Sequence, residues 1–256
     1  MNTLKLFDLN GKTALITGSG SGIGLSLAEG LGGAGATIIL NGRNESKLKE
    51  AKQDLTNKGI EVSYLVFDVT KDKQVKKAIQ NYQEKQGNID ILINNAGINL
   101  RGQFEEFDEA EWKKVLDINI NGAMIVSQAI GPQFIKQKSG KIINICSMQS
   151  ELGRATVVPY AVSKGGIKML TKALCAEWAK HNIQVNGIGP GYFETELTKP
   201  LKENPEFDEW LRNRTPAHRW GNTKELVGAA VFLSSEASNY VNGHILYVDG
   251  GLLASV

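Results

Sequence analysis

The sequence has few cysteines, few prolines and no long hydrophobic run. Its two cysteines, Cys146 and Cys175, lack metal-ligand spacing, so we expect reduced thiols and no metal site. No run of about 18 apolar residues is present, and the first twelve residues (MNTLKLFDLNGK) contain no apolar core of a signal peptide. These features predict a cytoplasmic protein without a membrane span.

The chain also lacks an excess of charge of either sign. Its 29 basic and 27 acidic side chains give a formal net charge of +2 over 256 residues. This balance predicts no bulk attraction to nucleic acid or to an anionic membrane, but it is compatible with a local basic pocket for a small anion. Hydrophobic residues make up 41% of the chain, which is enough for a sizeable core.

Short β-branched segments alternate with longer amphipathic segments along the chain. This alternation predicts an α/β fold, a Rossmann-like, doubly wound parallel sheet of about seven strands with helices on both faces. No linker divides the sequence, so we expect one domain over residues 1–256, with a less regular substrate lid at about 189–219. The expected strands are 13–17, 37–40, 62–67, 89–93, 141–145, 183–188 and 245–248.

A glycine-rich segment directly follows the first expected strand. Residues 17–24 read TGSGSGIG and lead into a helix from about residue 25. Glycines let the backbone turn sharply and approach a pyrophosphate, whose charge then faces the amides of the helix N-terminus. This context favours nucleotide binding over a merely flexible turn. The expected contacts are Gly18, Ser21, Gly22, Ile23 and Gly24.

The residues after the second strand bear on which dinucleotide is bound. A fold that selects NAD usually has an acidic residue there, which holds the ribose 2′-hydroxyl. This chain has Gly42, which cannot repel a 2′-phosphate, and Arg43, which can form charge-assisted bonds to one. The alternative is that Arg43 is a solvated residue at a helix start. The pattern favours NADP(H) and leaves NAD(H) open.

Two more segments follow expected strands, at the sheet edge where ligands bind in open parallel sheets. Asp68 could accept a hydrogen bond from an adenine amino group. Asn95 either contacts the cofactor or ties neighbouring strands together through its amide, and the sequence leaves both roles open. The further cofactor contacts expected are Asp68, Val69, Asn95, Ala96 and Gly97.

A serine, a tyrosine and a lysine predict a proton-transfer site. Tyr160 and Lys164 are four residues apart and therefore share one helix face. An ammonium beside a phenol favours the phenolate, so we expect a lowered pKa for Tyr160 and a general acid/base role. Ser147, after the fifth strand, can hold the same substrate oxygen. Asn119 either hydrogen-bonds through water to the lysine or packs inside a helix.

These motifs occur in the order and spacing of the short-chain dehydrogenase/reductase family, which the sequence resembles over essentially the whole chain. The resemblance implies a seven-stranded sheet, an oxidoreductase and commonly a tetramer. It also implies that Asn119 supports a water relay, Tyr160 transfers the proton and Lys164 binds the nicotinamide ribose. Further cofactor contacts are implied at Tyr160, Pro190, Gly191 and Thr195, the last on the nicotinamide side.

Within this family the sequence resembles the bacterial gluconate 5-dehydrogenases, at residues 145–154 (ICSMQSELGR), 214–217 (RTPA) and 219–221 (RWG). The resemblance implies interconversion of D-gluconate and 5-keto-D-gluconate with NADP(H). A sugar acid needs a cation for its carboxylate and polar groups for its hydroxyls. The expected substrate residues are Ser147, Gln149, Arg154 and Tyr160, with Arg101, Glu151 and Arg219 in or beside neighbouring loops.

Other substrates and roles stay open. A 3-ketoacyl carrier-protein reductase or a general sugar/polyol dehydrogenase would use the same scaffold, because substrate choice depends on variable loops. A nucleotide-sensing or scaffold protein without catalytic activity would usually lack the tyrosine or the lysine, and this chain has both Tyr160 and Lys164. The last residues, 248–256, are largely apolar, and in the family this region packs near a subunit interface. We therefore expect a homotetramer of two-fold symmetry.

Overall fold

A single parallel sheet forms the centre of the protein, which we describe from a computed structural model over residues 2–256. The strands lie in the order β3-β2-β1-β4-β5-β6-β7, so successive strands are added on one side of β1 up to β3 and on its other side from β4 onward. This confirms the predicted Rossmann-like α/β fold and places a ligand-binding crevice between β1 and β4, where the order reverses. The strands are β1 (Thr13–Ile16), β2 (Thr37–Gly42), β3 (Val62–Val66), β4 (Ile91–Asn94), β5 (Gly140–Ile145), β6 (Ile183–Pro190) and β7 (Ile245–Val248).

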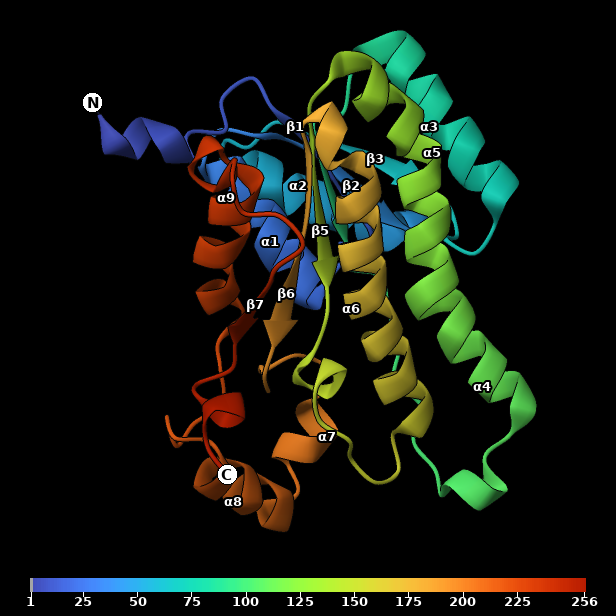
Figure 1. The fold of residues 1–256 in the computed structure, drawn as a ribbon, viewed down its shortest axis with the longest axis vertical. Coiled ribbons are helices and arrows are strands. Elements are labelled where there is room, and N and C mark those ends of the chain that lie inside the picture. The colour runs from blue at the N-terminus through green and yellow to red at the C-terminus, as the bar shows by residue number, and fades with distance from the viewer. Residues whose placement is uncertain (1) are drawn as a thin grey trace.

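Helices cover both faces of the sheet (Figure 1). Helices α1, α2 and α9 lie on one face, α3, α5 and α6 on the other, and α7 and α8 lie beyond the carboxyl ends of the strands. A π-helical turn (Asp117–Asn121) joins α4 to α5. The helices are α1 (Gly22–Gly33), α2 (Glu45–Asn57), α3 (Asp72–Gln86), α4 (Glu109–Leu116), α5 (Gly122–Gln137), α6 (Val158–Trp178), α7 (Lys199–Lys202), α8 (Pro205–Arg214) and α9 (Val227–Ser234).

The strands are buried on both faces because successive side chains enter two different cores. On β1, Ala14 and Ile16 pack into the core beneath α1 and α9, whereas Leu15 packs into the core beneath α3 and α5. On β2, Ile38 faces the first core and Ile39 the second. This double burial explains why the strands are apolar at both odd and even positions.

The stretch 189–219 is more regular than the sequence suggested, because it contains α7 and α8. The start of α8 has recognisable signals. The Asn204 side chain accepts a hydrogen bond of 3.1 Å from the backbone of Phe207, and Pro205 occupies the first helical turn. The helix places Phe207 and Trp210 beside the carboxyl ends of the strands.

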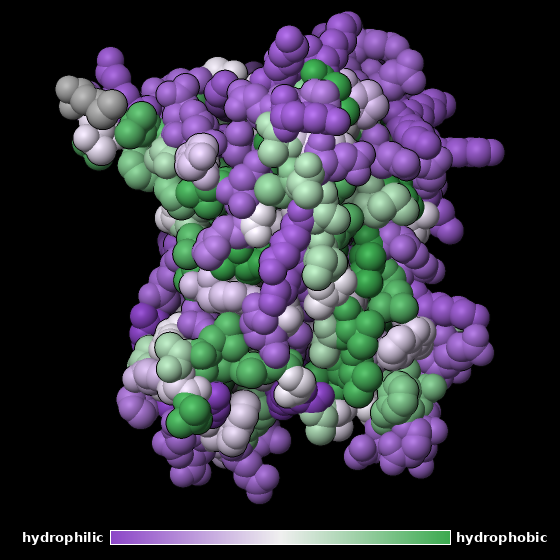
Figure 2. Space-filling view, viewed as in Figure 1, coloured by the Kyte–Doolittle hydropathy of each residue, from purple (hydrophilic) through white to green (hydrophobic). Residues whose placement is uncertain are grey.

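The surface is uneven in character (Figure 2). Hydrophobic side chains gather near α6 in the lower half of the view, while the upper end, over α3, is mostly hydrophilic. Exposed hydrophobic residues on α5 and α6 include Met124, Val162 and Met169. No helix in the described part of the chain is long and apolar enough to cross a membrane.

Candidate active site

A cavity of about 380 Å³ lies at the carboxyl ends of the central strands. It brings together loops that follow β1, β2, β3, β4 and β5, as the rule for open parallel sheets predicts. Pro190 and Gly191, at the end of β6, are not among its lining residues. The predicted cofactor residues that do line it are Gly18, Ser21, Gly22, Ile23, Gly24, Arg43, Asp68, Val69, Asn95, Ala96, Gly97, Tyr160, Lys164 and Thr195.

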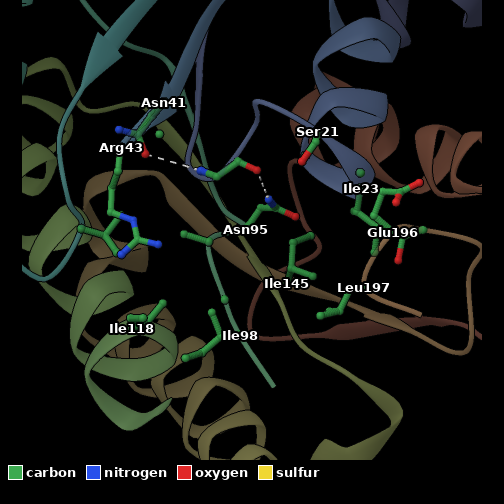
Figure 3. Close-up of a pocket in the computed structure, with 18 of the residues that line it drawn as sticks. Ser21, Ile23, Asn41, Arg43, Asn95, Ile98, Ile118, Ile145, Glu196 and Leu197 are labelled. Atoms are coloured by element: carbon green, nitrogen blue, oxygen red, sulfur yellow. Dashed lines mark hydrogen bonds between the residues drawn. The ribbon is translucent and has the colours of Figure 1, made fainter. Parts of the chain in front are cut away.

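The loop after β1 is held from two sides (Figure 3). The Asn41 side-chain oxygen accepts a hydrogen bond of 3.4 Å from the backbone N–H of Gly18. The Asn95 amide donates to the carbonyl oxygens of Thr17 and Gly18, at 2.9 and 3.0 Å. Asn95 therefore has the structural role that the sequence left open, and it also lines the cavity.

Gly22 and Gly24 of this loop differ in the space around them. Gly22 has a φ of +59°, and a Cβ atom there would meet nothing within 4 Å. Gly24 has no such space, since a Cβ would lie 2.5 Å from the Asn95 amide nitrogen. Gly22 thus leaves the backbone at the start of α1 open to a ligand, while Gly24 permits close packing. Amides at a helix N-terminus attract an anion such as a pyrophosphate.

Arg43 and Asp68 lie opposite each other at one end of the cavity. Their side chains approach to 3.9 Å, and the Arg43 side chain is 67% exposed. Burial raises the pKa of Asp68, but hydrogen bonds from Thr70 and the charge of Arg43 outweigh it and lower the pKa overall. The Arg43 guanidinium therefore has a loose ionic contact and keeps donors free for a second anion.

Ser147 lies beside Tyr160, which lines the cavity. Ser147 follows β5, and its hydroxyl donates a hydrogen bond of 2.8 Å to the Gln149 side-chain oxygen. Burial raises the pKa of Tyr160, and this effect outweighs a hydrogen bond with Ser147 and the nearby charge of Arg101. The expectation of a lowered tyrosine pKa is therefore wrong for this structure, and Tyr160 is a protonated phenol at neutral pH.

Lys164 lies beneath the Tyr160 ring, with its Nζ 5.5 Å from the ring centroid. The ammonium donates a hydrogen bond of 2.6 Å to the carbonyl oxygen of Ile145. Burial lowers the pKa of Lys164 to about 8. The i, i+4 spacing thus brings the two side chains onto one face of α6, as predicted.

Asn119 lies in the π-helical turn and is buried. Its amide nitrogen donates to the Ile98 carbonyl and to the Ser163 hydroxyl, both at 2.9 Å, and its oxygen accepts from the Ile98 N–H at 2.8 Å. Both amide hydrogens are therefore used. The side chain fixes the segment after β4 against α6, which is the packing role that the sequence left open.

The charge of Arg101 acts on both Arg154 and Tyr160. A 3.0 Å hydrogen bond from the Gly102 N–H to the Thr156 carbonyl joins the loops of the two arginines. Burial and the charge of Arg154 lower the pKa of Arg101. Among the described residues, no carboxylate lies within 4.0 Å of either guanidinium. Two cations that repel each other and have no acidic partner among the described residues attract an anion.

Two other charged candidates from the sequence are already engaged. Arg219 donates to both carboxylate oxygens of Glu225, at 2.7 and 2.8 Å. Glu151 accepts a hydrogen bond of 2.7 Å from the Tyr247 hydroxyl and pairs with Lys168. Arg219 and Glu151 are therefore poorly placed to hold a substrate, in contrast to Arg101 and Arg154.

The sequence missed several residues that line the cavity. Most of them lie at a strand end or within a few residues of one, so the rule that pointed to Asp68 and Asn95 could have found these as well. Glu196 and Leu197 come from the segment before α7 and carried no recognisable signal. The missed residues are Asn41, Phe67, Ile98, Ile118, Ile145, Glu196 and Leu197.

Comparison with known proteins agrees with this geometry. The 5-keto-D-gluconate 5-reductase of Escherichia coli (strain K12) is 53% identical over 98% of this chain and 99% of its own. The 2-dehydro-3-deoxy-D-gluconate 5-dehydrogenase of Formosa agariphila is 49% identical over 99% of this chain and 97% of its own. A crystal structure of a gluconate 5-dehydrogenase from Burkholderia cenocepacia, in complex with NADP and tartrate, superposes with a TM-score of 0.98.

That structure is 49% identical and covers all of both chains. The similarity confirms the resemblance to gluconate 5-dehydrogenases drawn from residues 145–154, 214–217 and 219–221. The short chain dehydrogenase family matches residues 12–206, which span the glycine loop, the cavity and the Ser147, Tyr160 and Lys164 cluster. The chain is an oxidoreductase that belongs to the short-chain dehydrogenase/reductase family.

Proposed function

We propose that the protein interconverts a secondary alcohol and a ketone on a sugar acid, with D-gluconate and 5-keto-D-gluconate as the first candidates. The observation that carries this proposal is the pair of unneutralised guanidinium groups, Arg101 and Arg154, beside Tyr160. A carboxylate placed there relieves the repulsion between the two cations. The names of the similar proteins point to the same substrate class.

The cofactor we propose is NADP(H), with NAD(H) as an alternative. Gly22 and the N-terminus of α1 suit a pyrophosphate, and Arg43 suits a 2′-phosphate. A bound nicotinamide supplies or accepts the hydride. Pro190, Gly191 and Thr195 complete the proposed contact set, together with Asp68, Val69, Ala96 and Gly97.

The proton is handled by Tyr160 in this proposal. In ketone reduction its phenol donates a proton to the carbonyl oxygen, and in alcohol oxidation the phenolate accepts the proton. Ser147 and Gln149 hold the reacting oxygen and its neighbouring hydroxyls. Lys164 orients the ring and binds the ribose, and Asn119 positions α6 against the strand ends.

The chain forms one catalytic domain in this proposal, with residues 189–219 as a lid. Thr195 and Leu197 from this segment line the cavity, and Leu197 is 64% exposed. We also propose a homotetramer, because Met124, Val162 and Met169 leave apolar surface exposed on α5 and α6. Light scattering at micromolar concentration tests the assembly, and a monomer alone would contradict it.

A spectrophotometric screen tests the substrate. Reduction of NADP⁺ and NAD⁺ is followed with D-gluconate, with 2-dehydro-3-deoxy-D-gluconate, with D-glucitol, the uncharged polyol related to gluconate, and with a 3-hydroxyacyl thioester. We expect activity with a sugar acid and a clear preference for it over the polyol. Activity only with an acyl thioester would favour a 3-ketoacyl carrier-protein reductase instead.

The variant Arg154→Ala links the screen to the site. It should raise the KM for gluconate strongly and spare the KM for NADP⁺, a loss of uniform substrate binding. It should also narrow the preference for gluconate over glucitol, because only the acid gains from the cation. An unchanged ratio would exclude Arg154 as the carboxylate anchor.

A further inference from the structure

Tyr192 lies two residues after β6, in the same segment as Thr195 and Leu197, which line the cavity, and contacts three other aromatic rings. Its ring packs edge-on against Phe207 of α8 and against Trp220, with centroid separations of 5.5 and 5.7 Å. The Tyr192 hydroxyl accepts a hydrogen bond from Nη1 of Arg154. Within the lid segment, Tyr192 thus contacts both α8 and a proposed substrate-binding cation.

Arg154 is held by aromatic groups rather than by an acidic side chain. Its guanidinium carbon lies 4.6 Å from the ring centroid of Phe207 and 5.4 Å from that of Trp210. Contacts between a cation and an aromatic face stabilise the guanidinium while leaving its charge unneutralised. Such a cage fixes where Arg154 points and preserves its attraction for a carboxylate.

Tyr192 is also connected to the reaction site. The Ser147 hydroxyl donates to the Gln149 oxygen at 2.8 Å, and the Gln149 side chain lies close enough to Tyr192 to act on its phenol. Burial raises the pKa of Tyr192 and outweighs its contacts with Arg154 and Gln149, so the phenol keeps its proton. Tyr192 therefore lies between the Ser147–Gln149 pair and Arg154, and its hydroxyl accepts a hydrogen bond from Arg154.

We propose that Tyr192 is a positioning residue that sets the preference for carboxylated substrates by holding Arg154 toward the reaction site. This inference rests on the proposed function, since it assigns a selectivity to the same site. Tyr192 does not transfer the proton. It acts through Arg154, and its aromatic contacts with α8 couple the orientation of that guanidinium to the lid segment.

Tyr192→Phe removes the hydroxyl and keeps the ring that packs on Phe207 and Trp220. We expect the KM for D-gluconate to rise about tenfold or more, in line with the loss of one hydrogen bond to a charged group. The kcat for gluconate, the KM for NADP⁺ and all constants for D-glucitol should stay within about twofold. The matched control is Tyr240→Phe, because the Tyr240 side chain is fully exposed.

A double-mutant cycle separates positioning from a general structural role. In the Arg154→Ala background, Tyr192→Phe should have no further effect on the KM for gluconate. Additive losses, or equal losses with gluconate and glucitol, would overturn the inference. Thermal unfolding of each variant checks that the fold is intact.

Direct binding distinguishes failure of this inference from failure of the proposed function. The probes are D-gluconate and tartrate, titrated calorimetrically into the enzyme with NADPH, a reduced cofactor with which gluconate cannot react. Wild-type protein that binds tartrate, more weakly after Tyr192→Phe, but turns over no sugar acid would refute only the proposed function. Turnover of gluconate unaffected by Tyr192→Phe would refute only the inference. Wild-type protein that binds neither probe would refute both.

Discussion

The Lys164 ammonium donates a hydrogen bond of 2.6 Å to the carbonyl oxygen of Ile145, the last residue of β5. This contact ties α6 to the strand that precedes Ser147. The lysine is only 5% exposed and has no acidic partner among the described residues. A cation in this position is costly to bury, which is why its pKa is lowered to about 8.

Removing this charge should stabilise the protein. In the folded state the pKa of Lys164 is about 8, below its ordinary value of 10.5, so the folded chain binds fewer protons between these two pH values. The destabilisation that results from burying the charged Lys164 is therefore fully present below pH 8 and disappears as the pH approaches 10.5. Lys164→Met should raise the free energy of unfolding at pH 7 by about 1–3 kcal/mol and abolish most activity.

Urea unfolding at pH 7 and pH 10 measures this effect. The increase in the free energy of unfolding caused by Lys164→Met should be large at pH 7 and small at pH 10. Lys136→Met, on the exposed side of α5, is the matched control and should change stability little at either pH. A variant that is less stable than wild type at pH 7 would show that the Ile145 hydrogen bond outweighs the burial cost.

The raised pKa of Tyr160 predicts different pH profiles for the two reaction directions. Ketone reduction needs the protonated phenol and should be nearly independent of pH from 6 to 8, whereas alcohol oxidation needs the phenolate and should accelerate as the pH rises. Initial rates in both directions measure this.

Tyr160→Phe should lower turnover by about two to four decades and retain cofactor binding. Near-normal turnover would exclude Tyr160 as the proton donor.

Cofactor choice should depend on Arg43. Arg43→Ala removes the guanidinium that lies 3.9 Å from Asp68. It should raise the dissociation constant of NADPH about tenfold, the effect of losing one charge-assisted hydrogen bond, and leave that of NADH nearly unchanged. Fluorescence titration measures both constants, with Lys49→Ala on α2 as the control. Equal losses for the two cofactors would make Arg43 a structural residue.

Much of the fold was predictable because its signals are local. Short apolar runs such as Ile89–Ile93 lie between amphipathic helices, and the alternation alone implies a parallel sheet. The sheet edge then gathers every strand end, so a rule about position predicted Gly22, Asp68 and Asn95 as neighbours.

The substrate end was less predictable because it depends on contacts between distant segments. Arg101, Arg154 and Tyr192 come from three loops, and no spacing in the sequence relates them. The pKa of Tyr160 was also mispredicted, since the effect of burial cannot be read from the spacing to Lys164. Likewise, only the structure shows that both carboxylate oxygens of Glu225 accept hydrogen bonds from the Arg219 guanidinium.

The contrast between Arg101 and Arg219 gives the last prediction. Both arginines follow from the sequence as carboxylate anchors, but Arg101 faces Arg154 without an acidic partner and Arg219 is paired with Glu225. Arg101→Ala should raise the KM for gluconate about tenfold or more. It removes one of the two cations between which the substrate carboxylate is proposed to bind. Arg219→Ala should leave that KM within about twofold and serves as the matched control. Steady-state kinetics with gluconate and glucitol measure both variants. A loss of gluconate affinity confined to Arg219→Ala would place the carboxylate near Glu225 and contradict the site proposed between Arg101 and Arg154.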